Sequence, residues 1–189
     1  MTRTTYFTAT TLDGYLADDH DSLDWLFVQD IDEEGPGNVA DFMATVGSLV
    51  MGATTYEWVM THMAEGEDDW PYEQPTWVLT HRDFDVPDGA DIRFAAADDD
   101  AAVRAVHAQM VEAAGDKDVW VVGGGGLAAD FARLGLLDEI SLAIAPVTLG
   151  SGRPLLPQPF DLELIELDRN RAFVVARYRV VGPRRGPGD

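Results

Sequence analysis

A run of four glycines stands between a short β-branched and aromatic stretch, residues 119–122, and the start of a helical pattern. The run comprises Gly123, Gly124, Gly125 and Gly126. Glycines at such a junction add nothing to packing, but they let another group approach the backbone closely. The free N–H groups at a helix start, with the positive end of the helix dipole, are suited to hold a phosphate. The run therefore predicts a site for a nucleotide cofactor.

Two other turns that follow expected strands have a composition suited to the same task. They comprise Gly52, Ala53, Thr54 and Thr55, and then Thr80, His81 and Arg82. Ligands of open α/β sheets bind beyond the carboxyl ends of the strands, so three such turns can hold one dinucleotide. Its pyrophosphate would lie on the helix N-termini, with Arg82 near a ribose or a 2′-phosphate. The alternative is structural: the glycine run is then a tight turn, and the threonine pair caps a helix.

Candidate acids are few, and each has a structural alternative. Asp13 could contact substrate or orient a proton donor, or it could simply be the turn residue of an Asp-Gly pair. Asp24, beside Trp25, could be an acid at the mouth of an apolar pocket, or a helix cap. Tyr56 and Trp58 have the helical spacing that is typical of core residues, although one of the two can still face a ligand.

Composition excludes several classes of site and partner. The 189 residues contain no cysteine and four histidines that lie far apart in sequence, so we expect no metal site and no thiol chemistry. The net charge of −21 would repel nucleic acid and anionic membranes. A saline cytoplasm and a GC-rich genome both account for this acidity.

The hydrophobic pattern alternates strands with helices up to residue 137, and strands then follow strands. We expect strands at residues 6–10, 15–17, 48–51, 76–80, 92–95, 119–122, 139–145, 162–167 and 173–181. Helices are expected after Asn38, after Thr54 or Thr55, after residues 98–100 and after the glycine run. The pattern predicts an α/β fold with a mostly parallel mixed sheet, antiparallel C-terminal strands and helices on both faces.

The remaining segments comprise an apolar patch, a loop and a tail. Residues 25–28 form an apolar patch, and residues 62–75, which are acidic and contain proline, predict a surface loop. We expect one domain over residues 1–181 and a disordered tail over 182–189, which is rich in proline, glycine and arginine. No apolar run is long enough to span a membrane, and the first residues lack a signal-peptide core, so we expect a cytoplasmic protein.

Four motifs together resemble the dihydrofolate reductase fold and, within it, the reductase domain of riboflavin biosynthesis. They are residues 11–17 (TLDGYLA), 51–57 (MGATTYE), 121–126 (VVGGGG), and 135–140 (GLLDEI) running into 145–152 (APVTLGSG). Their order and spacing match that family over nearly the whole chain, to about Val181. The chain is similar to stand-alone members of the family.

The resemblance implies a reductase that takes NADPH as its cofactor and a small heterocycle or a carbonyl or imine compound as its substrate. Residues 52–55 and 123–127, the latter including Leu127, would bind the cofactor phosphates, and residues 80–82 its adenosine end. A cis peptide bond, common in the family, would fall at Gly123-Gly124. Trp25, Tyr56, Leu149 and Gly150 would border the substrate, and a water or a carboxylate, Asp13 or Asp24, would deliver the proton. Relatives commonly pair, so we expect a homodimer.

Two departures from the family pattern bear on cofactor and substrate. Ala53 stands where relatives often carry an arginine for the cofactor phosphate, so NADH is not excluded. Val122 stands where the riboflavin-pathway enzymes tend to carry a glutamate, which weighs against their pyrimidine substrate. The nearest named activity is 5-amino-6-(5-phosphoribosylamino)uracil reductase. Alternatives are a non-catalytic nucleotide-binding or sensor protein, and a pterin reductase of the dihydrofolate reductase type.

Overall fold

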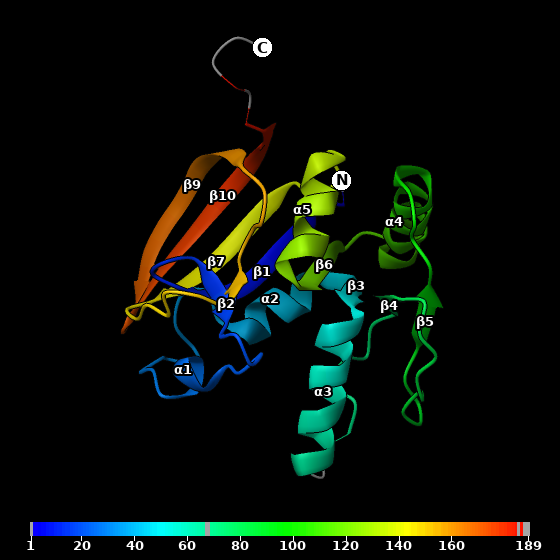
Figure 1. The fold of residues 1–189 in the computed structure, drawn as a ribbon, viewed down its shortest axis with the longest axis horizontal. Helices are drawn as coiled ribbons and strands as arrows, with labels where there is room; N and C mark the ends of the chain where they lie inside the picture. The colour runs from blue at the N-terminus through cyan, green and yellow to red at the C-terminus, as the bar shows by residue number, and fades with distance from the viewer. Residues whose placement is uncertain (1, 67–68, 185, 187–189) are drawn as a thin grey trace.

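An eight-stranded sheet with helices packed against both of its faces organises the chain (Figure 1). The structure, a computed structural model, describes residues 2–66, 69–184 and 186. The strands are β1 (Thr4–Thr11), β2 (Tyr15–Ala17), β3 (Val46–Gly52), β4 (Thr76–Leu79), β5 (Ile92–Ala95), β6 (Asp118–Gly123), β7 (Glu139–Ala145), β8 (Arg153–Pro154), β9 (Phe160–Asn170) and β10 (Phe173–Pro183). The helices are α1 (Asp24–Phe27), α2 (Val39–Thr45), α3 (Ala53–Gly66), α4 (Asp100–Ala114) and α5 (Gly125–Arg133).

The strand order in the main sheet is β5-β4-β3-β6-β1-β7-β10-β9. Neighbours from β5 to β7 run parallel, whereas β10 is antiparallel to β7 and β9 is antiparallel to β10. Strands β2 and β8 form a separate antiparallel pair. This topology confirms the predicted α/β fold with a mostly parallel sheet and antiparallel C-terminal strands.

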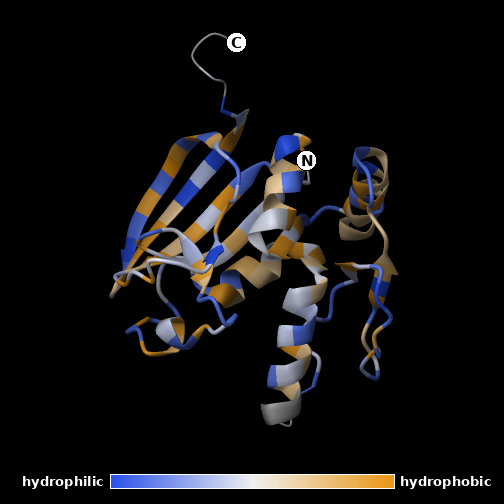
Figure 2. Cartoon of the chain, viewed as in Figure 1, coloured by the Kyte–Doolittle hydropathy of each residue, from blue (hydrophilic) through white to orange (hydrophobic). Residues whose placement is uncertain are grey.

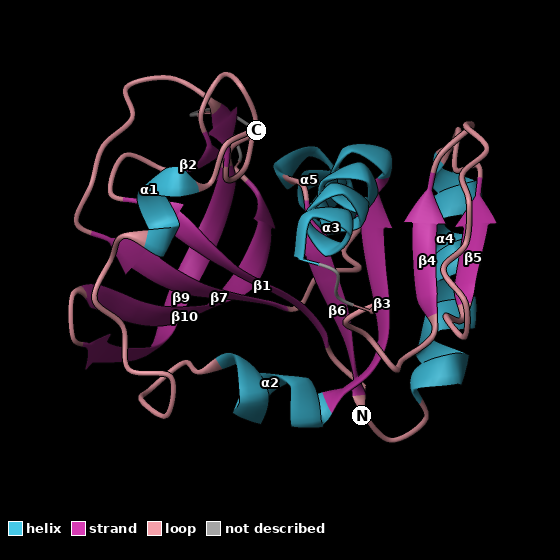
Figure 3. Cartoon of the chain, turned by 90° about the horizontal axis from the view of Figure 1, so that it is seen from below, coloured by secondary structure: helices cyan, strands magenta, loops and turns pink. Residues whose placement is uncertain are grey.

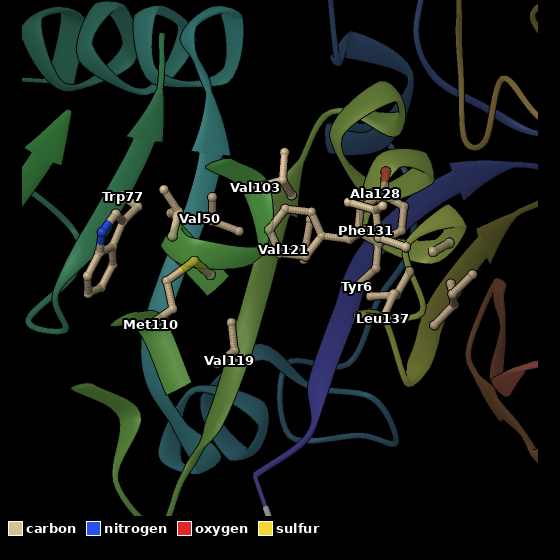
Figure 4. Close-up of a cluster of buried hydrophobic side chains, with 14 of the residues drawn as sticks. Tyr6, Val50, Trp77, Val103, Met110, Val119, Val121, Ala128, Phe131 and Leu137 are labelled. Carbon is tan, nitrogen blue, oxygen red and sulfur yellow. The ribbon is translucent and has the colours of Figure 1, made fainter. Parts of the chain in front are cut away.

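The larger hydrophobic core lies between one face of the sheet and helices α4 and α5 (Figure 4). Tyr6 is in register with Val121 on one side and with Ile140 on the other, so these buried side chains form one row across the sheet. Met110 from α4 and Phe131 from α5 complete the cluster, and both are fully buried. Strands covered on both faces are apolar at successive positions, which explains the unbroken β-branched run before the glycines.

Helices α2 and α3 cover the opposite face of the sheet (Figure 3). Phe42 of α2 stacks on Phe7 of β1, with ring centroids 4.1 Å apart, and meets Trp120 of β6 edge-on. Tyr56 of α3 is 1% exposed and packs with Met51. The prediction of helices on both faces is therefore confirmed.

The predicted helix signals at Asn38 and at the aspartate run are confirmed by their hydrogen bonds. The Asn38 side chain caps α2 by accepting from the Asp41 N–H at 2.7 Å. The Asp99 side chain caps α4 in the same way, accepting from the Ala102 N–H at 2.8 Å. Side-chain oxygens at these positions satisfy N–H groups that have no acceptor within the helix.

Several local predictions were wrong in detail. The loop expected over residues 62–75 begins later, because α3 continues to Gly66 through helix-forming residues. Residues 25–28, predicted only as an apolar patch, lie mostly in the short helix α1. Because α3 begins directly after β3, Thr54 and Thr55 lie inside its first turn and are not its cap.

The predicted tail also starts later than expected. Strand β10 runs to Pro183, and its last pairs join Gly182 to Asp161 and Pro183 to Phe160. Residues 185 and 187–189 of the predicted tail lie outside the described residues. Within the described part of the chain, none of the helices combines the length and the apolarity that a membrane crossing requires.

Candidate functional site

A cavity of about 840 Å³ opens at the carboxyl ends of β3 and β6. It is lined by both residue groups that follow these strands, 52–55 and 123–127, and by Thr8 and Ala9 of β1. In Figure 1, α3 and α5 approach each other near the middle of the view and extend in opposite directions from that point. Two of the three turns singled out in the sequence therefore meet at one cavity.

Helix α5 presents its N-terminus to this cavity without a capping side chain. Gly124 occupies the N-cap position, and the Ala128 N–H donates to its carbonyl at 3.1 Å. The N–H groups of Gly125, Gly126 and Leu127 precede this bond and have no acceptor one turn back in the helix. With the helix dipole, they form an environment suited to an anion.

The four glycines have separable physical roles. A Cβ on Gly125 would lie 2.2 Å from the Pro154 carbonyl oxygen and 2.5 Å from that of Leu155, so this glycine permits close backbone packing. A Cβ on Gly124 or Gly126 would have open space around it. Among the four glycines of the run, Gly124 and Gly126 are therefore the two that leave room at the cavity for a ligand. The peptide bond between Gly123 and Gly124 is cis, as the resemblance implied.

The first turn of α3 contributes small and hydroxyl side chains to the same cavity. Ala53, Thr54 and Thr55 line it, and Gly52 has open space where a Cβ would stand. The Thr55 hydroxyl lies 3.3 Å from the position that a Cβ on Gly123 would take, so the two turns are in close contact. Neither threonine is needed as a cap, and their hydroxyls are free to contact a ligand.

The third turn lies beside the cavity and does not line it. Arg82 donates from both terminal nitrogens to the Glu57 carboxylate, each at 2.8 Å, and Glu57 itself lines the cavity. Thr80 accepts from the Arg82 N–H at 2.9 Å, and His81 pairs with Asp98. The only contact between this turn and the cavity lining that the structure shows is the ion pair between Arg82 and Glu57.

Asp13 binds a neighbouring loop. Its carboxylate accepts from the Thr11 hydroxyl at 2.6 Å and from the N–H groups of Leu149 and Gly150 at 3.1 and 2.8 Å. The Thr11 hydroxyl, followed by these N–H groups, holds the pKa of Asp13 below its usual range. None of these four residues is among those that line the cavity. Asp13 therefore joins the turn after β1 to the loop at residues 149 and 150.

The other candidates from the sequence are divided between core and surface. Asp24 is exposed and is the first residue inside α1, with Leu23 at the N-cap position, so the cap interpretation was wrong. Trp25 is 8% exposed and packs with Ala145. Asp24 and Trp25 do not line the cavity.

Of the two aromatic residues on α3, Trp58 and not Tyr56 faces the cavity. The Tyr56 ring is buried, and its hydroxyl donates to the Asp85 carbonyl at 2.6 Å. Trp58 is half-buried. Helical periodicity placed both in the same helix, but only the tertiary structure distinguishes the face that packs on the sheet from the face that meets the cavity.

Four titratable residues that line the cavity were not singled out in the sequence: Asp21, Glu57, Tyr72 and Arg153. Arg153 donates to Asp21 at 2.9 Å, and this hydrogen bond lowers the pKa of the Asp21 carboxyl. Burial raises the pKa of Tyr72 to about 12, so its phenol stays protonated at neutral pH. The one sequence signal for Arg153 is its position after the Gly-Ser-Gly turn at residues 150–152. Among the described residues, no group of histidines and carboxylates is arranged to hold a metal ion.

Comparisons with known proteins agree with this geometry. The chain matches the model of the RibD C-terminal domain over residues 3–175. It is 32% identical to the uncharacterized protein YwjB of Bacillus subtilis, over 90% of this chain and 92% of that protein. It is 28% identical to the uncharacterized protein YyaP of the same organism, over 83% of each chain.

Solved structures show the same fold. A protein of Shewanella sp. PV-4 provisionally assigned to riboflavin biosynthesis aligns with a TM-score of 0.76 at 27% identity, over 95% of this chain and 99% of that one. The deaminase/5-amino-6-(5-phosphoribosylamino)uracil reductase of Thermotoga maritima aligns with a TM-score of 0.67 at 15% identity. The alignment covers 95% of this chain and 56% of that longer protein.

The fold is that of the RibD-like reductases. The chain belongs to the RibD C-terminal domain family and is related to the riboflavin biosynthesis reductases.

Because Gly125 and Gly126 have different surroundings, replacing each by alanine should have opposite effects on the stability of the fold. Gly125→Ala places a methyl group against two backbone carbonyls and should destabilise the fold by about 1–3 kcal/mol. Gly126→Ala meets open space in a helix, where alanine is preferred by up to about 1 kcal/mol, so its stability should be equal or higher. Urea unfolding followed by circular dichroism measures both. Equal loss of stability in the two variants would contradict the assignment of close backbone packing to Gly125 and open space to Gly126.

Proposed function

We propose that the chain is an NAD(P)H-dependent reductase of a small heterocycle or a carbonyl or imine compound. The observation that carries the proposal is that the N-termini of α3 and α5 and the glycine run open on a single cavity. Two helix N-termini at one cavity are suited to the two charges of a pyrophosphate. The chain belongs to a family of reductases, and this membership supports a redox role for the bound nucleotide.

The residues present fit a dinucleotide. Open space stands where a Cβ would lie on Gly52, Gly124 and Gly126, so the backbone can approach phosphate oxygens directly. Thr54 and Thr55 add hydroxyl donors in the first turn of α3. A bound nicotinamide would supply a hydride, and the protein would hold it against the substrate in the cavity.

The proton needed alongside the hydride must come from within the cavity. Asp13 and Asp24 lie outside the cavity lining, whereas Tyr72 lines it. Burial raises the pKa of Tyr72 to about 12, so its phenol stays protonated but is a weaker acid than an ordinary tyrosine. We therefore assign proton delivery to a water in the cavity, which the Tyr72 hydroxyl can position by a hydrogen bond.

Cofactor binding tests the proposal. Titration calorimetry should detect NADPH or NADH binding, at low salt and at high salt that screens the acidic surface. Gly126→Val places a branched side chain in the phosphate approach and should weaken the affinity at least about tenfold, because two methyl groups then occupy the open space. Ala101→Val, in the first turn of α4, is the matched control and should leave the affinity for both nucleotides unchanged.

No binding of either nucleotide at millimolar concentration, at both salt concentrations, would overturn the proposal. Undiminished affinity in Gly126→Val would show that the glycine run is only a turn. Binding without NADPH oxidation by any candidate substrate would favour the non-catalytic alternative.

The ion pair between Arg82 and Glu57 predicts how the cofactor phosphate is chosen. With Ala53 in place of an arginine, Arg82 is the cation beside the cavity that can bind a 2′-phosphate, by exchanging Glu57 for it. Arg82→Ala should then weaken NADPH about tenfold more than NADH, while Glu57→Gln should strengthen NADPH more than NADH. Affinities from calorimetry give the two ratios. Equal changes for both cofactors would refute this role.

A homodimer would be formed through the outer part of the sheet. Leu162, Leu164, Leu167 and Val174 are 39–63% exposed, and the strand register places them on one face of β9 and β10. Figure 2 shows these two strands in alternating hydrophobic and hydrophilic bands. On the opposite face, Arg177 and Arg179 pair with Glu166 and Glu163. An exposed apolar sheet face of this kind typically marks an association surface.

Leu164→Glu should convert the dimer to a monomer, because it introduces a charge into the apolar face. Val28→Glu makes the same change at a residue that is 78% exposed elsewhere and should leave the dimer intact. Sedimentation equilibrium measures both, and raised salt should favour the dimer by screening the net charge of −21 on each copy. A monomeric wild type at all salt concentrations would contradict the proposal.

A further inference from the structure

Besides the glycines and threonines, the cavity is lined by a set of apolar and aromatic side chains. Leu23 and Leu26 line it from the α1 segment, Trp58 lines it from α3, and Tyr72 and Val122 complete the surface. Helices α1 and α3 lie apart in both Figure 1 and Figure 3, so they contribute from separate sides. This part of the cavity is suited to an apolar group.

Trp58 is held in place by a stacked neighbour. The His62 ring lies 3.7 Å from the Trp58 ring, centroid to centroid, with 26° between the planes. The His62 Nδ1 lies 2.8 Å from the Trp58 carbonyl oxygen, which holds the imidazole over the indole. Trp58 lines the cavity and His62 does not, so one face of the indole is covered and the ring is presented to the cavity.

The ionised side chains that line the cavity are paired. Asp21 binds Arg153, and Glu57 binds Arg82 through two hydrogen bonds. Val122, beside the glycines, carries no charge. A substrate with an ionised group would have to break one of these pairs or remain unpaired at a largely apolar surface, and either costs free energy.

We propose that the substrate is an uncharged, planar aromatic ring that stacks on Trp58. The inference rests on the proposed function, because it takes the glycine part of the cavity to be the cofactor's and leaves this part to the substrate. Stacking on an aromatic side chain requires a flat ring and no particular hydrogen-bonding groups. Trp58 is then the residue that determines specificity, and the Asp21–Arg153 and Glu57–Arg82 pairs select against anions.

This substrate class separates the chain from the reductases to which it is similar. The Thermotoga maritima enzyme is named for a phosphoribosylamino-uracil, which carries a phosphate. In this chain, the side chains that line the cavity supply one cation, Arg153, and Asp21 neutralises it. A phosphate on the substrate would compete with Asp21 for Arg153 and with the cofactor for the helix N-termini.

Two probes that share a ring and differ by one charge test the proposal. Lumazine is a neutral bicyclic heterocycle at a pH slightly below neutral, and lumazine-6-carboxylate is its anionic counterpart. Their affinities are measured by calorimetry on the wild type, Trp58→Leu and Trp58→Phe, with melting temperatures to verify folding. Because Trp58 is half-buried, both variants should fold. The measurements are repeated at about 1 M salt, which screens the long-range field of the acidic surface.

Wild-type protein should bind lumazine at least about tenfold more tightly than the carboxylate, at both salt concentrations. Trp58→Leu should lose about tenfold or more in lumazine affinity, and Trp58→Phe should retain most of it, since one stacked ring contributes about 1–3 kcal/mol. Equal or tighter binding of the carboxylate at high salt, no lumazine binding, or undiminished binding in Trp58→Leu would overturn the proposal.

NADPH titrations on the same proteins separate this proposal from the one on which it rests. Trp58→Leu should bind NADPH like the wild type, because the proposed phosphate contacts come from the glycine run and from Thr54 and Thr55 and not from the Trp58 side chain. If the wild type binds lumazine through Trp58 and binds no nicotinamide nucleotide, the cofactor assignment fails while the ring site stands. If NADPH binds and the lumazine pattern is absent, only the substrate class is wrong.

Discussion

The parallel pairing of β3 with β6 is the interaction on which the rest of the site depends. These strands are separated by α3, β4, β5 and α4 in the chain, yet Leu49 is in register with Trp120 and Met51 with Gly123. The register ends both strands at the same edge of the sheet. The helices that follow, α3 and α5, therefore begin side by side, and their N-termini share one cavity.

Close backbone packing completes that cavity on its second side. Gly125 lets the start of α5 contact the Pro154 and Leu155 carbonyls, and this contact places Arg153 in the cavity lining. Strand β8 in turn pairs with β2, which holds the segment around Asp21 near Arg153. Gly125 thus links the glycine run to the segments that carry Arg153 and Asp21.

The sequence predicted most elements and the main topology, because these depend on local patterns. Period-two and helical spacing, the Asn38 and Asp99 caps and the glycine junction are all readable in short windows. The glycine run was correctly located at the start of α5, at a cavity. The predicted ends of elements were less accurate. Helix α3 ends at Gly66, but its last residues are polar and resemble a loop in composition, so the loop was predicted to begin at residue 62.

The sequence by itself determined the fold class, the family resemblance and the location of the two turns, residues 52–55 and 123–127, that open on the cavity. The tertiary structure alone decided which side chains share the cavity: Trp58 and not Tyr56, Tyr72 and not Asp13 or Asp24, and the Arg153–Asp21 pair. It also placed Leu164 and Leu167 on one sheet face, because a β-bulge between them changes the alternation. Local patterns give the type and period of an element, whereas the orientation of a side chain depends on packing against residues distant in sequence.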